Sequence, residues 1–425
     1  MSRGPRFTQD FLMQLRQKVD LVDLVGEKVQ LRRTGGKYVG KCPFHEDGRP
    51  SFQVDPAEGF YRCWGCGKTG DAVQWVREHG EASFLDAVEQ LARRAGLPLP
   101  KAEDTGVERS RQHLAPLYQA LSEAQRIYWG GLAKHPKAES FLQDERGLTQ
   151  DSIQSFELGV VGRGVVKLLR RPDQVLIEAG LAIQDEHGRV YDRFRDRVMF
   201  PIRNERGHLI SFAGRALTIA DHIPKYLNGP ETELFRKHHE LYGLHLAKNS
   251  IRKTQKAVVV EGYFDVIQGH QAGDTRLVAS MGTAVSPAQV QRLLRLADEL
   301  VFVFDGDVPG RKASLSAAKV FLGEMEDGKS ASFVFLPDEH DPDSYLRRYG
   351  ITGWQDLLKT AQPLSQVLAR YVSHGLDMAI PESQVKASGK AKECIRLITG
   401  APMYARALCS HLEQVIQISL AEERA

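Results

Sequence analysis

The sequence lacks any long run of apolar residues. Its 425 residues contain no uninterrupted apolar segment close to the ~18 residues that a membrane-spanning helix needs. Residues 1–20 also lack the apolar core of a secretory signal, so we expect a cytoplasmic protein. Low-complexity tracts and internal repeats are absent as well, and a hydrophobic content of 42% excludes a wholly disordered chain.

Cysteine is scarce, and neither sign of charge dominates. Five cysteines, an odd number in a long chain without a visible signal, argue against a disulfide framework. The 57 basic and 54 acidic side chains leave a net charge of only +3, which does not by itself indicate a nucleic-acid-binding protein. The length allows about three domains with separate cores.

Three of the five cysteines lie close together in the sequence, beside a histidine. The segments Cys42-Pro-Phe-His45 and Cys63-Trp-Gly-Cys66 have the spacing C-x2-H-x17-C-x2-C. Each two-residue gap lets a tight turn present two side chains to one ion, and two such turns supply the four ligands of tetrahedral zinc. Because no coordination position is left open, we predict one structural zinc ion in a zinc ribbon.

Aromatic and basic residues surround the predicted zinc site. This combination suits stacking on single-stranded bases together with phosphate contacts. It comprises Lys37, Tyr38, Lys41, Phe60, Tyr61, Arg62, Trp64 and Lys68. Two alternatives stay open, because Phe60 and Tyr61 could instead pack in the small core of the ribbon, and because a zinc ribbon can equally bind protein.

The hydrophobic pattern divides the chain into five parts of an α/β multi-domain protein. The fourth part alternates apolar strands with helices, which predicts a parallel sheet covered by helices. The expected parts are a zinc-ribbon domain (1–98), a linker (99–112), a mixed α/β domain (113–255), this parallel-sheet domain (256–343) and a helical bundle (344–425).

Local patterns also predict individual elements. Expected helices cover residues 11–19, 71–95, 114–132, 165–169, 288–296 and 312–322. Expected strands cover residues 38–40, 51–54, 60–62, 197–202, 208–212, 257–260, 276–280, 300–304 and 333–336. A turn is expected at 205–207, and no strong strand is expected in 345–425.

Acidic residues follow three of the strands predicted in the parallel-sheet domain. They are Glu261 and Asp265, then Asp305 and Asp307, and then Asp341 and Asp343. The carboxyl ends of parallel strands meet at one edge of an open sheet, so we expect these carboxylates to converge there. Ligands that are all oxygen select Mg²⁺ or Mn²⁺, ions that handle substrate phosphates. A capped turn is the commoner meaning of an isolated Asp-x-Asp, and this alternative stays open above all for Asp265, Asp341 and Asp343.

Arginines are frequent between the predicted zinc site and the acidic residues. They comprise Arg189, Arg193, Arg195, Arg197, Arg203, Arg206 and Arg215, followed by Lys225-Tyr-Leu-Asn228 and preceded by Arg146. Arginine forms forked hydrogen bonds with phosphates, which suits a nucleic-acid path beside a phosphate-handling metal site. Asp192, Asp196 and Glu205 lie among the arginines, so pairing within the protein stays open for any one of them.

In this order, the motifs resemble those of the bacterial replicative DNA primases, the DnaG family, over nearly all of residues 5–425. Residues 42–66 resemble the CHC2-type zinc finger of that family, and residues 191–202 and 225–232 resemble two further signatures of its core. Residues 260–265, 305–307 and 341–343 resemble toprim motifs, which the family shares with type IA topoisomerases.

The resemblance implies a toprim RNA polymerase fold that synthesises short RNA primers on single-stranded DNA from ribonucleoside triphosphates. It implies Mg²⁺ or Mn²⁺ ligation by Glu261, Asp305 and Asp307, with Asp265 among the catalytic carboxylates and with Asp341 and Asp343 assisting a second ion. Template or nucleotide contacts are implied for Arg146, Arg203, Arg215, Lys225, Tyr226 and Asn228. The zinc ribbon would help to choose the initiation site, with Trp64 and Lys68 as expected DNA contacts.

Other toprim proteins and a binding module are the alternatives. A topoisomerase would need a catalytic tyrosine in a large separate domain, and a toprim nuclease would need neither the zinc ribbon nor the 225–228 signature. A single-strand-binding module would not need Glu261, Asp305 and Asp307 together. Members of the primase family usually continue into a helical domain that binds the replicative helicase, whereas this sequence ends at Ala425, so the helicase as a partner stays open.

Overall fold

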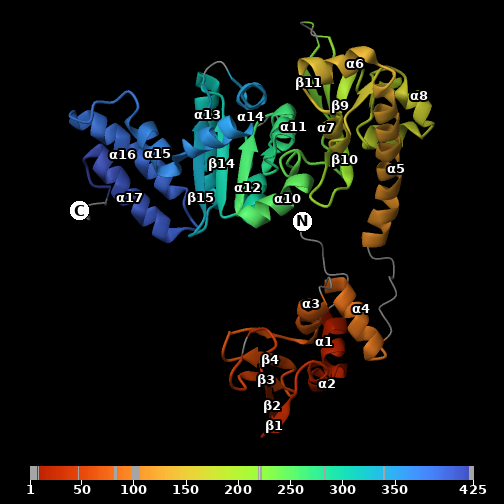
Figure 1. The fold of residues 1–425 in the computed structure, drawn as a ribbon, viewed down its shortest axis with the longest axis vertical. Helices are drawn as coiled ribbons and strands as arrows, with labels where there is room; N and C mark the ends of the chain where they lie inside the picture. The colour runs from red at the N-terminus through yellow and green to blue at the C-terminus, as the bar shows by residue number, and fades with distance from the viewer. Residues whose placement is uncertain are drawn as a thin grey trace. The chain divides into compact units, whose positions relative to one another are not determined.

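The computed structural model describes residues 7, 9–45, 47–80, 84–97, 106–218, 220, 223–281, 284–337 and 340–420. The chain divides into two compact units, residues 1–111 and 112–425 (Figure 1). None of the described helices is long and apolar enough to cross a membrane.

The first unit is an antiparallel sheet with helices packed on it. Its strands follow chain order across the sheet: β1 (Arg32–Thr34), β2 (Lys37–Gly40), β3 (Phe52–Asp55), β4 (Phe60–Cys63) and β5 (Thr69–Gly70). The helices are α1 (Gln9–Lys18), α2 (Leu21–Gly26), α3 (Ala72–Gly80) and α4 (Phe84–Arg94). These elements confirm the zinc-ribbon interpretation, although residues 81–83 of the segment 71–95, where we expected helices, lie outside the described residues.

Alternation along β3 and β4 decides which aromatic residues of this unit are buried. Phe52 and Tyr61 are fully buried, and their rings stack with centroids 5.2 Å apart. Trp75 of α3 meets the Tyr61 ring edge-on at 5.5 Å. Phe60, one residue away, points to the other face and is 37% exposed. Of the two open readings for Tyr61, packing in the core is therefore the one that the structure shows.

The predicted linker 99–112 is in part helical. Helix α5 runs over Gly106–Leu132 and so begins inside the segment that we expected to be irregular. Residues 99–105 lie outside the described residues. A polar sequence with several charged side chains is compatible both with a linker and with the first turns of a helix, and composition cannot separate the two.

The mixed α/β region is built around a four-stranded antiparallel sheet. The order across the sheet is β11 (Tyr226–Asn228), β10 (Leu209–Ala216), β9 (Arg197–Arg203) and β6 (Gly159–Val161), and β7 (Ala182–Gln184) pairs separately with β8 (Val190–Asp192). The short helices are α6 (Pro136–Ser140), the π-helical turn η1 (Phe141–Glu145), α7 (Gln150–Ser155), α8 (Val165–Leu169) and α9 (Asp173–Glu178). Gly207, at φ +85°, closes the predicted turn between β9 and β10.

A doubly covered sheet follows. Its order is β13 (Leu277–Ala279), β12 (Lys256–Val260), β14 (Glu299–Phe304), β15 (Ser330–Phe335) and β16 (Gln362–Pro363), parallel except for β16. Its helices are α10 (Leu244–Thr254), α11 (Tyr263–Ala272), α12 (Pro287–Leu294), α13 (Val308–Glu324) and α14 (Pro342–Lys359). The parallel sheet confirms the sequence-based fold, and the two-residue strand β16 lies in the segment 345–425, where we expected no strong strand.

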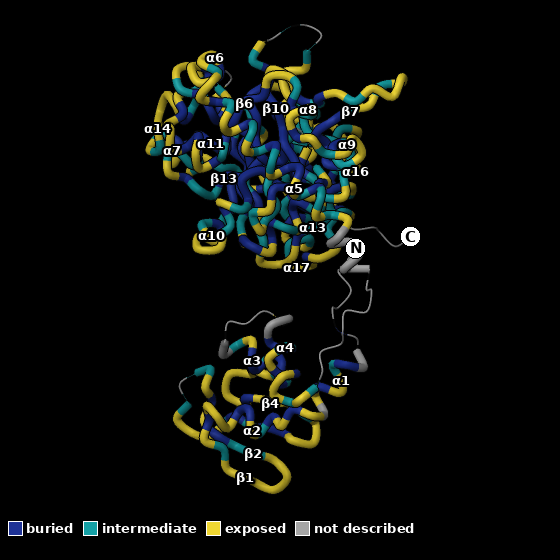
Figure 2. The backbone as a smooth tube through the Cα atoms, turned by 90° about the vertical axis from the view of Figure 1, so that its right-hand side faces the viewer, coloured by how far each residue is buried: buried dark blue, intermediate teal, exposed yellow. Residues whose placement is uncertain are grey.

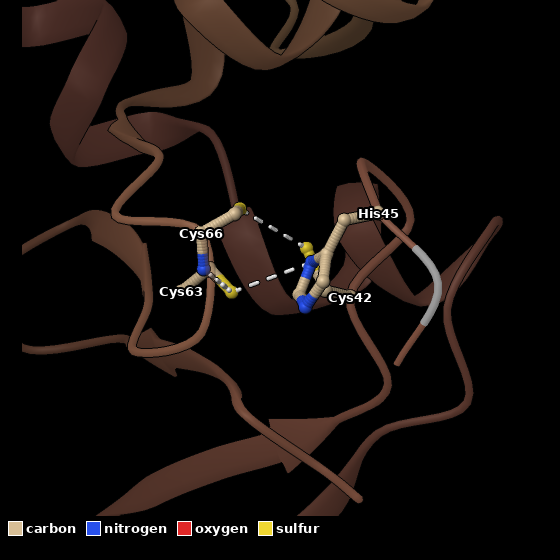
Figure 3. Close-up of side chains that lie close together, drawn as sticks. All are labelled: Cys42, His45, Cys63 and Cys66. Carbon is tan, nitrogen blue, oxygen red and sulfur yellow. Dashed lines mark hydrogen bonds between the residues drawn. The ribbon is translucent and has the colours of Figure 1, made fainter. Parts of the chain in front are cut away.

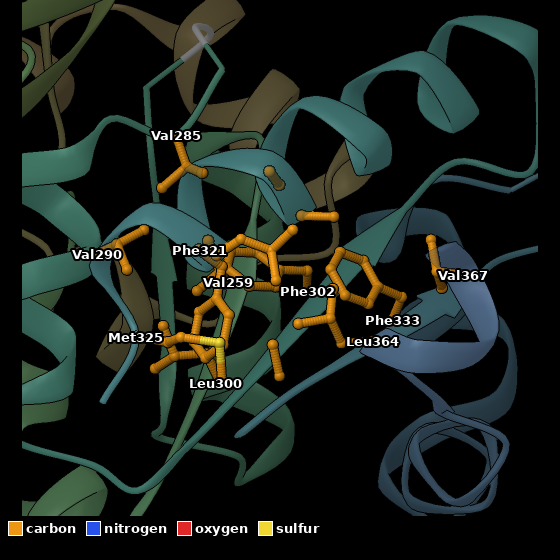
Figure 4. Packing of buried hydrophobic residues seen from close by; sticks show 14 of the residues in the cluster. Val259, Val285, Val290, Leu300, Phe302, Phe321, Met325, Phe333, Leu364 and Val367 are labelled. Atoms are coloured by element: carbon orange, nitrogen blue, oxygen red, sulfur yellow. The ribbon is translucent and has the colours of Figure 1, made fainter. Parts of the chain in front are cut away.

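The last helices share a core with this sheet. They are α15 (Leu364–Ser373), α16 (Pro381–Arg396) and α17 (Pro402–Ile416). Leu364 and Val367 of α15 join Phe302 and Phe333 of the sheet in one buried cluster (Figure 4). In the burial view, the backbone around β10 and β13 is mostly dark blue, whereas many outer loops are yellow (Figure 2). Because the strands are covered on both faces, their carboxyl-terminal ends are where functional side chains reach the surface.

Candidate functional site

The four predicted zinc ligands lie together in the first unit. The Sγ atoms of Cys42 and Cys66 are 3.9 Å apart, and Cys63 Sγ is 3.9 Å from His45 Nδ1 (Figure 3). Tetrahedral zinc with Zn–S bonds of ~2.3 Å separates two sulfurs by about 3.8 Å, so the donor set fits zinc. Among the described residues, this is the one group of three or more such side chains whose ligand atoms all lie within 4.8 Å of one another.

Asp47 orients the zinc knuckle from outside the ligand set. Its Oδ2 accepts hydrogen bonds from the backbone N–H of Cys42 at 2.9 Å and from the Ser51 hydroxyl at 2.8 Å, and that hydroxyl lies 3.3 Å from Cys63 Sγ. The Cys42 N–H bond comes first among the causes that lower the pKa of Asp47 to about 2. The sequence analysis missed Asp47, although an acidic residue two positions after a metal-ligating histidine is a signal that could have found it.

Hydrogen bonds also prepare the thiols for a cation. Burial raises the pKa of Cys63, but bonds from Ser51 and from the N–H groups of Cys66 and Gly65 outweigh it and lower that pKa to about 6. Burial raises the pKa of the neighbouring Cys42 to about 12. The surroundings thus favour the thiolate form of Cys63 and oppose that of Cys42. A bound cation would stabilise both thiolates.

Trp64 is the most exposed of the described aromatic side chains near the knuckle. Trp64 is 65% exposed, the Arg62 guanidinium lies 4.2 Å from its ring centroid, and its indole N–H donates to Gln53 Oε1 at 3.2 Å. Lys68 is engaged within the unit, because its Nζ pairs with Glu78 at 3.2 Å and lies 4.6 Å over the Phe44 ring. Of the two DNA contacts predicted here, Trp64 is therefore the one that is free to stack on a ligand.

In the second unit, Glu261 directly follows β12, Asp305 directly follows the adjacent strand β14, and Asp307 lies two residues later at the start of α13. Desolvation and the charges of Asp305 and Asp307 raise the pKa of Glu261. Desolvation likewise raises the pKa of Asp305, with further contributions from the charges of Asp341 and Asp307. These carboxylates therefore lie close enough to oppose one another's ionisation, and a divalent cation would relieve that opposition.

The donor set that these carboxylates offer suits a hydrated ion. Mg²⁺ is usually bound by one or two carboxylates and keeps several of its water ligands. A site whose donors are all oxygen atoms favours Mg²⁺ or Mn²⁺ over zinc. The residues present fit a divalent cation that also meets substrate phosphates.

Asp307 has a second role as the N-cap of α13. Its Oδ1 accepts the backbone N–H of Gly310 at 2.7 Å. A Cβ atom at Gly310 would lie 2.1 Å from the carbonyl oxygen of Asp305, so no other residue fits where the helix turns back over β14. Gly310 thus fixes the spacing between the two aspartates, and the sequence analysis did not single it out.

The remaining acidic residues differ in exposure. Asp341 is exposed and caps α14, accepting the Ser344 N–H at 2.8 Å, whereas Asp265 and Asp343 are buried. Asp265 accepts the N–H groups of Gly262 at 2.8 Å and of Asp343 at 3.2 Å. Burial, followed by the charge of Asp341, raises the pKa of Asp265 to about 7. The structure therefore places Asp341 on the exposed side and the two buried carboxylates behind it.

Arg146 joins the mixed α/β region to the parallel sheet. It follows the π-helical turn η1 and forms an ion pair with the buried carboxylate of Asp343, which also accepts Arg347 Nε at 2.9 Å. The Arg146 guanidinium lies 4.7 Å over the Phe264 ring. Single π-helical turns are frequent at functional sites, and this one directs Arg146 toward the acidic residues.

Arg215 and Tyr226 lie beside Arg146. Arg215 is buried, stands 4.1 Å over the Phe141 ring, and leaves its Nε without a hydrogen-bond partner. Tyr226 is 37% exposed, and the charges of Arg146 and Arg215 act on its pKa, which desolvation raises. Lys225 is exposed, and no carboxylate among the described residues pairs with it. Arg146, Arg215 and Lys225 together therefore offer positive charge that can bind a phosphate.

Asn228 is held at both ends of its amide. It accepts the Tyr263 hydroxyl at 2.5 Å on Oδ1, and its Nδ2 donates to the carbonyl oxygen of Met281 at 3.2 Å. Arg193 in turn donates to the backbone carbonyl of Asn228 at 3.0 Å. The side chain therefore joins β11 to α11, and sequence reasoning missed Tyr263 as the residue that orients it.

Arg203 is the predicted site residue that the structure does not bring to this group. It pairs with Glu157 and donates to the carbonyl oxygen of Gly207 at 2.7 Å. Val198 of β9 faces Arg215, so Arg203 lies five residues, or about 17 Å, further along the strand. There it lines a hollow of about 560 Å³ together with Arg126 and His208.

Comparisons with known proteins cover most of the chain. Residues 7–106 match the CHC2 zinc finger family, residues 128–248 match the N-terminal domain of the DNA primase catalytic core, and residues 255–335 match the Toprim domain. A DNA primase of Pseudomonas putida is 40% identical over 404 residues, which cover 92% of this chain and 61% of the relative. A DNA primase of Neisseria meningitidis is 39% identical over 420 residues, covering 96% and 70%.

Solved structures agree with these matches. A DNA primase domain from Pseudomonas aeruginosa superposes with a TM-score of 0.68 at 37% identity, covering 71% of this chain and 97% of that one. A DnaG primase catalytic domain bound to single-stranded DNA gives a TM-score of 0.64 at 34% identity, with coverage of 71% and 98%. The chain spans about three-fifths of the length of the Pseudomonas putida relative, 61%.

Proposed function

The chain belongs to the DnaG family of DNA primases, and from this premise we propose that it synthesises short RNA primers on single-stranded DNA from ribonucleoside triphosphates. The observation that carries the proposal is the gathering of Glu261, Asp305 and Asp307 at adjacent strand ends, where desolvation and the charges of the two aspartates raise the pKa of Glu261. The relative solved with bound single-stranded DNA supports the choice of template.

Glu261, Asp305 and Asp307 would hold Mg²⁺ or Mn²⁺, with Asp341 beside them. Bound there, the ion would lower the pKa of the attacking 3′-hydroxyl and neutralise charge on the departing pyrophosphate. The protein itself contributes position, because Gly310 fixes the turn that carries Asp305 and Asp307. Asp265 and Asp343 are buried and act as supports. Asp265 accepts the Gly262 N–H at the start of α11, and Asp343 pairs with the Arg146 guanidinium.

Cationic side chains would bind the phosphates. Arg146 and Arg215 lie over aromatic rings at distances of 4.7 and 4.1 Å, so their guanidinium groups are fixed before the substrate arrives. Lys225 supplies a point charge next to Tyr226, whose ring is available for stacking. Arg203 makes an internal ion pair, so we assign it to the support of the β9–β10 hairpin.

The zinc-ribbon unit would recognise the template where synthesis begins. Its zinc ion holds two turns together, and the exposed ring of Trp64 beside Arg62 offers stacking together with positive charge. We place the activity in the cytoplasm, where chromosomal replication supplies single-stranded template. Metal-assisted transfer of this kind does not require a dedicated protein base.

The test is primer synthesis on mixed-sequence single-stranded DNA with labelled ribonucleotides and Mg²⁺. Asp305→Asn removes one carboxylate charge, and Asp356→Asn is the matched control because Asp356 is 65% exposed near the far end of α14. Short RNA products that disappear with Asp305→Asn and persist with Asp356→Asn support the proposal. Cleavage of the template, or binding without products, contradicts it and favours a toprim nuclease or a binding module.

A further inference from the structure

Three aromatic rings form a cluster directly beside Asp341. His340 precedes Asp341, and Tyr345 and Tyr349 follow on α14, with ring centroids 5.7 Å (His340–Tyr345), 5.6 Å (His340–Tyr349) and 4.6 Å (Tyr345–Tyr349) apart. Tyr349 is 45% exposed. None of these rings belongs to the toprim motifs or to the arginine-rich path, so nothing above accounts for an aromatic group at this place.

The cluster is anchored to the acidic site. Ser344 Oγ lies 3.2 Å from His340 Nδ1 and also receives the Asp341 N–H at 3.1 Å, so one hydroxyl ties the histidine to the cap of α14. One turn further, Arg347 binds Asp343. The rings are therefore fixed relative to the carboxylates rather than carried on an independent loop.

Tyr349 is also fixed from its other side. Gly350, at φ +64°, interrupts α14 directly after Tyr349, and the chain then turns so that Gly353 packs against the tyrosine. A Cβ atom at Gly353 would lie 2.5 Å from Tyr349 Cβ. Gly353 thus leaves room for the Tyr349 side chain and restricts its position. A ring that is already restricted loses less conformational entropy when a ligand binds to it.

A cation accompanies the exposed ring. The Arg348 guanidinium lies 5.3 Å from the Tyr349 ring centroid, and within the described part of the chain no carboxylate pairs with Arg348. An aromatic face beside an unpaired guanidinium matches a nucleobase and its neighbouring phosphate. A protein partner would leave the nearby carboxylates of Asp341 and its neighbours without a role in the contact.

We propose that His340, Tyr345 and Tyr349 form a stacking platform for a nucleobase at the rim of the catalytic carboxylates, with Arg348 contacting the adjacent phosphate. The base belongs either to the single-stranded template or to a ribonucleoside triphosphate, and the stacking chemistry is the same for both. This inference rests on the proposed function for the presence of these ligands at the site.

The test compares Tyr349→Leu, which removes the aromatic face but keeps apolar bulk, with Tyr349→Phe, which keeps the ring. Binding of a labelled single-stranded oligonucleotide and binding of ATP with Mg²⁺ are measured separately on the full chain. We expect Tyr349→Leu to weaken one of the two about five- to fiftyfold, as for loss of one base–aromatic stack, and Tyr349→Phe to stay within about twofold. The ligand that is weakened identifies the source of the base.

Three results would overturn the platform. They are unchanged binding of both ligands with Tyr349→Leu, equal losses with Leu and Phe, or self-association that Tyr349→Leu abolishes, which would make the surface a contact between copies of this chain. Each binding arm supplies either the oligonucleotide or ATP with Mg²⁺ and never both, so neither arm needs catalysis. If Tyr349→Leu weakens binding as expected but the parent chain makes no primers, the proposed function is wrong and the stacking platform is still supported.

Discussion

Arg146 and Asp343 form an ion pair although 197 residues separate them in the sequence. The carboxylate side chain is 1% exposed and the arginine side chain 18% exposed, so the pair lies mostly out of water. Two different parts of the second unit supply the partners, the π-helical turn and α14. The contact therefore sets how the arginine-bearing region meets the carboxylates.

Removal of one partner should be costly. Arg146→Ala leaves a buried carboxylate with Arg347 as its remaining cation, and we expect the free energy of unfolding to fall by about 3 kcal/mol. Asp343→Asn should relieve part of that loss in the double variant, since the uncompensated charge is then gone. Urea denaturation of the two single variants and the double variant measures the coupling, and strictly additive losses would contradict a direct pair.

Asp307 allows charge to be separated from helix capping. Asp307→Asn keeps an oxygen that can accept the Gly310 N–H, whereas Asp307→Ala loses both the cap and the charge. We expect the asparagine variant to unfold within about 0.5 kcal/mol of the parent and the alanine variant to lose about 1 kcal/mol. Primer synthesis should fall more than about 100-fold in both, while single-stranded DNA binding persists. Near-parental synthesis by the asparagine variant would remove Asp307 from the metal site.

The grouping of the zinc-knuckle residues and the strand-end positions of Glu261 and Asp305 were predictable because their determinants are local. A two-residue gap between ligands is a property of one turn, and a carboxylate at a strand end inherits its place from the sheet. Contacts between residues that are far apart in the chain leave no such spacing pattern in the sequence. The burial of Asp343 by Arg146, the tie between Asn228 and Tyr263, and the internal pairing of Arg203 with Glu157 are of this kind.

Neighbouring aromatic residues show the same limit on a smaller scale. Tyr61 and Trp64 both lie near the zinc ligands in the sequence, yet Tyr61 is fully buried and Trp64 is 65% exposed. The face on which a strand residue lies depends on where the strand begins and on the helix that covers it, here α3 with Trp75. Composition alone therefore predicts an aromatic surface here but cannot say which of its aromatic residues are exposed.

The raised pKa of Asp265 predicts a pH-dependent stability. Its folded-state pKa of about 7 exceeds the usual value of 3.8, so between these values the folded chain binds more protons than the unfolded chain. The contribution of Asp265 to the free energy of unfolding should accordingly fall as pH rises through that window. Denaturation at pH 5, 6 and 8 without added Mg²⁺ or Mn²⁺ should show this slope lessened in Asp265→Asn. Parallel profiles for the parent and the variant would argue that the carboxylate is ionised throughout.

Loss of zinc should separate initiation from elongation. Cys66→Ala removes one of four ligands, and because a structural zinc ion holds its turns in place, we expect zinc content to fall from one ion per chain and the knuckle to lose its fold. The carboxylates lie in the other compact unit, so extension of an RNA primer already annealed to template should persist while synthesis without a primer fails. Cys409→Ala is the matched control, since this half-buried thiol lies on α17 outside the knuckle. Equal loss of both reactions in Cys66→Ala would show that the zinc-ribbon unit supports the chemical step itself rather than the choice of where synthesis begins.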